Sequence, residues 1–432
     1  MTKLKMIVNG GQIPSGRIQI SGAKNAATRL MAAALLTREN VILLNFPTEL
    51  VDVQHKGRFM ASIGAKVEYD RIGNSICINA NDIGSGRLDS YDFPIRTTYL
   101  LAAGQIAQNG VARIPYPGGC KLGERKYDLH LLVWEKLGCL VVEKEDHIEI
   151  TAKSGRFVGS EIDFPISTVG GTENALLCAV LARGETRIRN AYITPEIENL
   201  IHMLHLMGAD VMVEGASMIT IRGVDSLRGA TVEVIPDRIE ALTWIVYAAL
   251  SGGRVVIDDV PFSLMEIPLK HLRDVGLNYF KNENSVYVAP ECFSKHFIQP
   301  FEVACGTHPG IISDMQTFYV LLALKAAGRS VIIDYRYPER TAFVDELSKF
   351  CEGALSWDSG QVAMIRVNGP VALKSAEVNS TDLRGSMTQV LAALIAEGES
   401  VVHDVGMALR GYNNMEEKLR SLGIEFSLET DA

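Results

Sequence analysis

The sequence has no long apolar run and few cysteines. None of its apolar runs approaches the roughly 18 residues that a membrane-spanning helix needs, and the opening stretch MTKLKMIVNGGQIPSG lacks the apolar core of a secretory signal. The seven cysteines are an odd number, widely spaced, and form no C-x-x-C pair, which argues against a disulfide framework. These absences predict a reduced, cytoplasmic protein that binds no membrane.

An excess of positive charge is also missing. The 42 Lys and Arg residues against 51 Asp and Glu residues give a net charge of −9, which disfavours nonspecific binding of nucleic acid but leaves room for a local basic pocket. The glycine-rich stretches match neither a Walker A loop nor a dinucleotide-binding fingerprint. His202 and His205 share a helix face without an acidic partner in a zinc-ligand pattern. We therefore expect no nucleic-acid partner and no metal.

What the sequence does have is a sixfold repeat. A glycine that follows a helix-like stretch and precedes a β-like run recurs 68 to 77 residues apart, at Gly64, Gly138, Gly208, Gly276, Gly353 and Gly423. Upstream of each lies an Ala- and Leu-rich segment, at 26–36, 99–107, 174–182, 241–250, 315–327 and 387–396. A fixed period of this kind marks a repeated supersecondary unit that cannot bury its apolar face alone.

Each repeat reads as strand, apolar helix, strand, amphipathic helix and two-stranded hairpin. In the first repeat the helices are expected at 23–36 and 51–63, and the hairpin at 66–79. A helix that is apolar all round is a buried element. The predicted fold is therefore α/β, in two domains of three βαβαββ-like units, with the apolar helices inside and the sheets outside. We expect the domains to span 24–235 and 1–23 plus 236–432.

Polar groups stand where the apolar helices begin: Lys24 with Asn25, Arg96, Thr168 and the glycines after it, Asp237, Asp314, and Asp382 with Arg384. Helix N-termini favour anions, and guanidinium groups suit carboxylate and phosphate. Other interpretations stay open at this point. Lys24 could be a solvated side chain after a Ser21 cap, Asp314 and Asp382 could be N-caps, and the arginines could form surface ion pairs.

The loop PGGCKLGER at 117–125 is the sharpest local signal. Its paired glycines add little bulk, and Cys120 lies beside Lys121 and near Arg125. Neighbouring cations favour a thiolate or tune the thiol as an acid. The alternative is a surface loop with an incidental cysteine.

These motifs together resemble a known family. SGAKNAA at 21–27, PGGCKLGER at 117–125, DLH at 128–130, VGGTEN at 169–174, PDRIE at 236–240, HPG with SDMQ at 308–316, TDLR at 381–384 and RGY at 410–412 occur in the order found in UDP-N-acetylglucosamine enolpyruvyl transferases. The resemblance covers essentially the whole chain. It implies two lobes, each an inside-out α/β barrel of three repeats, with the active site in the cleft between them.

The implied reaction moves the enolpyruvyl group of phosphoenolpyruvate onto a substrate hydroxyl and releases phosphate, without a metal or organic cofactor. By resemblance, Cys120 is the general acid for C3 of the donor and Asp314 is the base on the acceptor hydroxyl. The groups implied to hold the donor are Lys24, Arg96, Arg125, Asp382, Arg384 and Arg410. Those implied to contact the acceptor are Asn25, Arg125, Lys126, Tyr127, Asp128, Thr168, Val169, Gly170, Asp314 and Tyr337. A fosfomycin-like epoxide is expected to alkylate Cys120.

The acceptor is less well defined by the sequence, because the departures from the family pattern concern acceptor handling. Lys126 and Tyr127 follow Arg125 where the family has proline, and Thr168 replaces a serine. The 3-hydroxyl of UDP-N-acetylglucosamine, for peptidoglycan precursors, is the first hypothesis. A paralogue that acts on uridine monophosphate in nucleoside-antibiotic synthesis is the rival, since Lys126 suits a smaller, more anionic acceptor. A non-catalytic nucleotide-binding homologue is disfavoured by the retained Lys24, Cys120 and Asp314.

Overall fold

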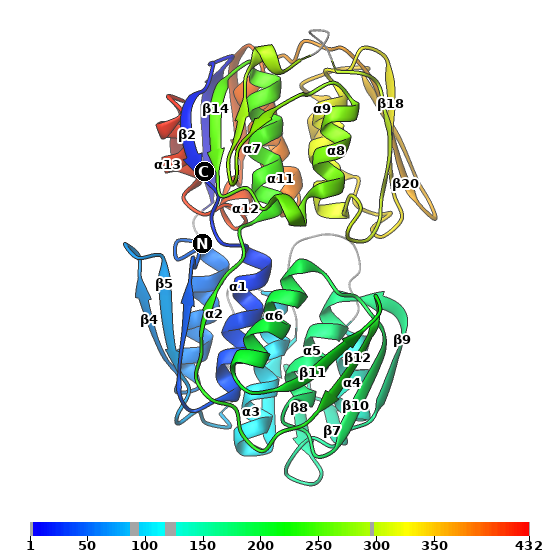
Figure 1. Cartoon of the computed structure of the whole chain (residues 1–432). Coiled ribbons are helices and arrows are strands. Elements are labelled where there is room, and N and C mark those ends of the chain that lie inside the picture. Colours follow the sequence, from blue (N-terminus) through cyan, green and yellow to red (C-terminus); the bar gives the residue numbers. More distant parts are fainter. Residues whose placement is uncertain (1–2, 87–94, 117–126, 294–297, 432) are drawn as a thin grey trace. The chain divides into compact units, whose positions relative to one another are not determined.

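The computed structural model describes residues 3–86, 95–116, 127–293 and 298–431, and Cys120, Arg125 and Lys126 lie outside them. The described residues form two compact units (Figure 1), which we call the first unit (within 22–235) and the second unit (3–21 with 236–431). The described chain contains five four-stranded sheets and one three-stranded sheet together with α-helices. The predicted α/β class is confirmed.

The first unit holds three sheets. Their strands, in spatial order, are β13 (Thr231–Glu233), β3 (Asn40–Leu44), β5 (Ser75–Asn79) and β4 (Lys66–Asp70); then β6 (Val111–Pro115), β8 (His147–Ala152) and β7 (Cys139–Glu143); then β11 (Asp210–Glu214), β12 (Met218–Arg222), β10 (Glu185–Ala191) and β9 (Glu161–Thr168). Its longer helices are α1 (Lys24–Ala33), α2 (Val51–Ser62), the 3-10 helix η2 (Arg96–Leu100) that leads into α3 (Leu101–Asn109), α4 (Asp128–Lys136), α5 (Val169–Ala179) and α6 (Pro195–Leu206).

The second unit also holds three sheets. Their strands, in spatial order, are β21 (Glu377–Asn379), β22 (Gly398–His403), β1 (Leu4–Gly10) and β23 (Ser427–Thr430); then β15 (Phe280–Lys281), β16 (Val286–Val288), β14 (Arg254–Asp258) and β2 (Ser15–Gln19); then β17 (Glu302–Cys305), β18 (Arg329–Asp334), β20 (Ala363–Asn368) and β19 (Leu355–Ser359). Its longer helices are α7 (Arg238–Ser251), α8 (Glu266–Asp274), α9 (Gln316–Ala323), α10 (Ala342–Ser348), α11 (Leu383–Ile395) and α13 (Met415–Ser421).

The four-stranded sheets share one topology. Each has a parallel pair at one edge followed by two antiparallel pairings, as in β13–β3–β5–β4. Three of the sheets take a strand from a distant part of the chain. The edge strand β13 comes almost 200 residues after β3, the N-terminal strand β1 lies between β22 and β23, and the edge strand β2 pairs with β14. A repeat whose own consecutive residues supply too few strands for its sheet therefore takes the missing strand from a distant segment of the chain.

The core of each unit is built on three apolar helices. In the first unit α1, α3 and α5 pack against one another, and in the second unit α7, α9 and α11 do the same. These helices lie among the sheets (Figure 1) and are buried along almost their whole length. Such burial on all sides explains the absence of a polar face on these segments.

The six repeat glycines follow the second helix of each repeat. All of them adopt a left-handed backbone conformation, with φ between 77° and 110°. A side chain would strain this conformation, whereas glycine reverses the chain after a helix without a Cβ clash. The regular recurrence of glycine in the sequence thus reflects a backbone requirement repeated six times.

Candidate functional site

In the second unit, polar residues meet at the beginning of α11. Asp382 caps this helix, because its Oδ1 accepts hydrogen bonds from the backbone N–H groups of Arg384 (3.1 Å) and Gly385 (3.3 Å). The N-cap interpretation of Asp382 is therefore confirmed. Asp314 differs, since it lies inside the short 3-10 helix Ser313–Met315, whose N-cap is Ile312. The N-cap interpretation of Asp314 is wrong, and its carboxylate instead contacts Arg340 and Arg384.

Arg340 joins these two acidic side chains. Its Nη2 lies 2.5 Å from Oδ1 of Asp382, and its Nη1 donates to Oδ1 of Asp314 at 3.2 Å and to the carbonyl of Ser313 at 2.8 Å. The side chain is 2% exposed. Burial alone would lower the pKa of Arg340, but the carboxylates of Asp382 and Asp314 outweigh it and raise that pKa. One buried guanidinium therefore fixes the orientation of both carboxyl groups.

Arg384 is the second buried cation of this cluster. Its Nε lies 3.7 Å from Oδ2 of Asp314, and its guanidinium carbon stands 5.3 Å from the ring centre of Tyr412. Nε and Nη1 are buried and make no hydrogen bond within the described chain. Burial opposes the charge, yet Tyr412 and Asp314 raise the pKa of Arg384. A buried guanidinium with unused donors is suited to binding an anion in a defined orientation.

Other predicted residues of the second unit lie in its loops. Arg410 is buried at the end of the short helix α12 (Gly406–Leu409), with Nη1 4.0 Å from Sδ of Met407. Tyr337 is half-buried, and its backbone N–H donates to Oδ1 of Asp334 at 3.1 Å. Asp237 caps α7 by accepting from the N–H groups of Ile239 and Glu240. Burial raises the pKa of Asp237, while Arg384 opposes that rise.

In the first unit, Lys24 opens α1 and is paired. Its Nζ lies 2.6 Å from Oδ2 of Asp52 on α2, and its side chain is only 13% exposed. The residue before the helix is Ala23, and no side chain caps it. The interpretation of Lys24 as a solvated lysine after a Ser21 cap is therefore wrong. Asn25, the next residue of α1, is half-buried.

The start of α5 is a second polar turn of the first unit. Oγ1 of Thr168 accepts from the N–H of Gly171 at 3.2 Å, so Thr168 is the N-cap and α5 begins at Val169. A Cβ at Gly170 would lie 3.1 Å from Nε2 of His130, so glycine allows α4 to approach this turn. Burial, assisted by Arg96, lowers the pKa of His130 to about 3, which leaves the imidazole uncharged.

The remaining predicted residues of this unit flank α4 and η2. Asp128 is the first residue of α4, and the hydroxyl of Tyr127 donates to Oε1 of Glu143 at 2.6 Å. This hydrogen bond is the main reason why the pKa of Tyr127 rises to about 12. Arg96 opens η2 and is half-buried. Lys24, Arg96 and the Thr168 turn thus all lie at starts of the buried helices, as predicted from the sequence.

Sequence reasoning missed several charged residues that are buried in the structure, among them Arg340, Arg29, Glu173 and Lys56. Glu173 was quoted only as part of the VGGTEN motif, and Lys56 falls on the face of α2 that packs inward. No local motif marks them. A charged residue at an inward position of an amphipathic helix is the signal that could have singled out Lys56.

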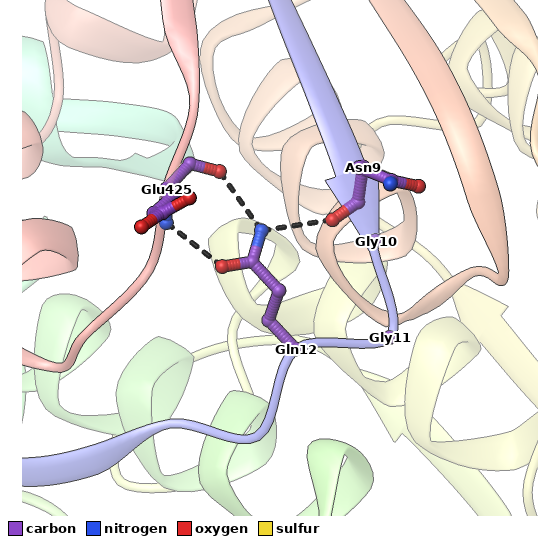
Figure 2. Close-up of a pocket in the computed structure, with 5 residues that line it drawn as sticks. All are labelled: Asn9, Gly10, Gly11, Gln12 and Glu425. Carbon is purple, nitrogen blue, oxygen red and sulfur yellow. Dashed lines mark hydrogen bonds between the residues drawn. The ribbon is translucent and has the colours of Figure 1, made fainter.

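A separate polar pocket lies in the second unit, lined by Asn9, Gly10, Gly11, Gln12 and Glu425. Figure 2 shows the Gln12 amide bridging the two chain segments: Nε2 donates to the carbonyls of Asn9 and Glu425, and Oε1 accepts from the N–H of Glu425, each at 2.8 Å. The nitrogen and the oxygen of this amide thus both have hydrogen-bond partners. None of the predicted site residues lines the pocket. We assign it no chemistry.

The described residues contain no cluster of three or more His, Cys, Asp or Glu side chains arranged to hold a metal ion. Within the same ranges, no helix is long and apolar enough to cross a membrane. His205, one of the pair at helical spacing, hydrogen-bonds through Nε2 to the carbonyl of Val211 at 2.7 Å.

Comparison with known proteins gives concordant matches. The family model described as EPSP synthase (3-phosphoshikimate 1-carboxyvinyltransferase) matches residues 8–419. The chain is 37% identical to the UDP-N-acetylglucosamine 1-carboxyvinyltransferase of Novosphingobium aromaticivorans over 98% of both chains. It is also 37% identical to the enzyme of that name from Koribacter versatilis, over 98% of this chain and 95% of the relative.

Solved structures share the fold. The enolpyruvyl transferase NikO from Streptomyces tendae aligns over 100% of both chains with a TM-score of 0.86 and 23% identity. EPSP synthase from Acinetobacter baumannii aligns over 99% of this chain and 100% of its own with a TM-score of 0.72 and 17% identity. At these identities the structural matches carry the fold and no more.

Proposed function

Since the chain belongs to the EPSP synthase family of carboxyvinyltransferases, we propose that it transfers the enolpyruvyl group of phosphoenolpyruvate to the 3-hydroxyl of UDP-N-acetylglucosamine and releases phosphate. The named relatives at 37% identity over almost the full chain support this acceptor. The product would be a peptidoglycan precursor, and we place the enzyme in the cytoplasm.

The observation that carries the proposal is the cluster of Asp314, Arg340 and Arg384. A base must present its carboxylate to the acceptor hydroxyl in a fixed orientation, and Arg340 provides that orientation from a buried position. The donor brings carboxylate and phosphate groups, and Arg384 has buried N–H groups without hydrogen bonds. Positioning and preorganised electrostatics of this kind need no cofactor.

In the proposed reaction, Asp314 accepts the proton of the acceptor hydroxyl while the hydroxyl oxygen bonds to C2 of the donor. Cys120 gives a proton to C3, which completes a tetrahedral intermediate. The Cys120 thiolate then takes a proton from C3 while the bond between C2 and the phosphate oxygen breaks, which gives the enol ether and free phosphate. The residues proposed to hold the phosphate and carboxylate of the donor are Lys24, Arg96, Arg125, Asp382 and Arg410. The residues of the Thr168 turn are proposed to contact the acceptor.

The proposal also covers the arrangement of helices and sheets within each unit. We infer that each unit is an inside-out α/β barrel of three repeats, with predicted lobes of 24–235 and 1–23 plus 236–432. The packing of α1, α3 and α5, and of α7, α9 and α11, supports it, because three mutually packed apolar helices need sheets around them. We propose that both lobes contribute residues to the same reaction.

The test is phosphate release from phosphoenolpyruvate with UDP-N-acetylglucosamine and, separately, with uridine monophosphate. Asp314→Asn should lower kcat by about 10²- to 10⁴-fold, the range of general-base catalysis. Asp358→Asn is the matched control, because Asp358 forms an exposed ion pair with Arg366 in the same unit. Equal loss in both variants would contradict the role of Asp314.

The thiol has its own test. Cys120→Ala should abolish turnover without loss of folding, and a fosfomycin-like epoxide should add its mass to the peptide that contains Cys120. An active enzyme without that adduct would argue against a thiol at the donor.

A second acceptor is favoured by a specific observation in the sequence. Lys126 and Tyr127 stand where the family pattern has proline after the loop arginine, and a lysine suits the extra charge of a nucleoside monophosphate. Faster phosphate release with uridine monophosphate than with UDP-N-acetylglucosamine would support the paralogue. Tight nucleotide binding without phosphate release from either would support a non-catalytic homologue.

A further inference from the structure

Lys56 is a fully buried lysine in the first unit, and the proposed reaction gives it no direct role. It lies on α2 and is 0% exposed. Its Nζ donates to two backbone carbonyls, that of Thr28 on α1 at 2.5 Å and that of Thr97 on η2 at 3.0 Å. One side chain therefore joins three segments of the chain that are remote in sequence.

The surroundings of Lys56 are charged as well as buried. Arg29 of α1 forms an ion pair with Glu173 of α5, and both side chains are at most 10% exposed. Burial is the main cause that lowers the pKa of Lys56 to about 7; Glu173 raises this pKa and Arg29 lowers it. A neutral amine still has two N–H groups, as many as the two carbonyls require. The two hydrogen bonds can thus persist in either protonation state.

The two segments that Lys56 joins carry cations of the proposed donor site. Thr28 lies one helical turn after Lys24 on α1, and Thr97 directly follows Arg96 on η2. Asp52, one turn before Lys56 on the same face of α2, pairs with Lys24 itself. Along one face, α2 therefore contacts the side chain of Lys24, the turn that follows it, and the backbone beside Arg96.

Packing alone does not explain a lysine at this position. Burying an ammonium group costs free energy that an apolar side chain of similar length would not incur. The carbonyl of Thr97, in contrast, gains a donor that a methionine could not supply. The benefit of the lysine is the fixed distance between α1 and η2.

We propose that Lys56 is a positioning residue for phosphoenolpyruvate binding, which sets the separation of Lys24 and Arg96 by tying the backbone of α1 to that of η2. The inference rests on the proposed function, because it takes these two cations as part of the donor site. Lys56 itself touches neither substrate in this scheme.

The test compares Lys56→Met with Gln54→Met. Gln54 lies on the same helix and also donates to a backbone carbonyl, that of Thr48 at 3.0 Å, but this carbonyl belongs to the turn before α2. In Lys56→Met the KM for phosphoenolpyruvate should rise about tenfold, and by a larger factor than the KM for the acceptor. Gln54→Met should change the KM for phosphoenolpyruvate less than twofold.

A second readout does not depend on turnover. Amide hydrogen exchange should become faster at 24–28 and 95–98 in Lys56→Met and stay unchanged there in Gln54→Met. A folded Lys56→Met with unchanged KM for phosphoenolpyruvate, or with unchanged exchange in both segments, would overturn the inference.

The two proposals fail in different ways. If the unmodified protein releases no phosphate with any acceptor, the proposed function fails, and the exchange measurement alone decides whether Lys56 ties α1 to η2. If Lys56→Met does not fold, Lys56→Leu, which also lacks an N–H donor, is measured in the same two ways. Wild-type values of KM and exchange in that variant would also overturn the role of Lys56.

Discussion

Replacing Lys56 by methionine should remove a pH-dependent contribution to stability. In the folded protein the pKa of Lys56 is lowered from 10.5 to about 7, mainly by burial. Between these two values the unfolded chain holds a proton that the folded chain has lost. Stability from this residue therefore rises with pH across that window, and below pH 7 its full destabilising effect is present.

The magnitude follows from the shift in the pKa. A difference of one pKa unit corresponds to about 1.4 kcal/mol, so complete titration changes the free energy of unfolding by about 5 kcal/mol. Between pH 7 and pH 9.5, a range that experiments can reach, the change is about 3 kcal/mol. Relative to Lys56→Met, the unmodified protein should gain this amount over that range.

The assay is urea unfolding of both proteins at several pH values, followed by circular dichroism and tryptophan fluorescence. Other groups titrate in the same window, and burial raises the pKa of Tyr99 and Cys178 in the folded state. These groups are present in both proteins, so the difference between the proteins isolates Lys56. A difference that stays constant from pH 7 to pH 9.5 would refute the reasoning, because it would mean that Lys56 titrates alike in the folded and unfolded chains.

Three further predictions concern other charged residues. Arg340→Met should destabilise the second unit by about 3–5 kcal/mol, because it leaves Asp314 and Asp382 without their buried partner; chemical denaturation measures this, and a loss below 1 kcal/mol would contradict it. The same variant should lower kcat by more than tenfold in the phosphate-release assay, since the Asp314 carboxylate loses its fixed orientation; wild-type kcat would show that Arg340 is dispensable. Asp431 and Glu377 raise the pKa of His403 through hydrogen bonds of 2.8 and 2.7 Å, so His403 stabilises the fold below its ordinary pKa and loses that effect as pH rises through the raised value. His403→Gln should flatten the dependence of the melting temperature on pH in this window, and an unchanged slope would count against it.

Much of the fold follows from the sequence because its signals are local. The hairpin expected at 66–79 is present as β4 and β5, and the helix expected at 51–63 as α2. The repeat glycines have the left-handed backbone that their position after a helix predicts. The polar turn that opens the third apolar segment in the sequence is also found where expected, because Thr168 caps α5 and the helix begins at Val169.

Part of the candidate site could also be located from the sequence. Lys24, Asp382 and Thr168 stand at the starts of buried helices, as their position before apolar segments suggested. Their partners could not be found in the same way. Asp52 pairs with Lys24 across 28 residues and Arg340 with Asp382 across 42, and no short-range pattern relates such residues.

The sequence by itself therefore determined the repeat, the βαβαββ order and the polar starts of the apolar helices, because period, alternation and capping act over a few neighbouring residues. Tertiary structure alone decided which charges are buried together, as with Lys56 against Thr28 and Thr97. It also decided that β1 and β13 complete sheets formed by remote segments. Burial and pairing between distant residues depend on how helices and sheets pack, and that packing is a property of the whole chain.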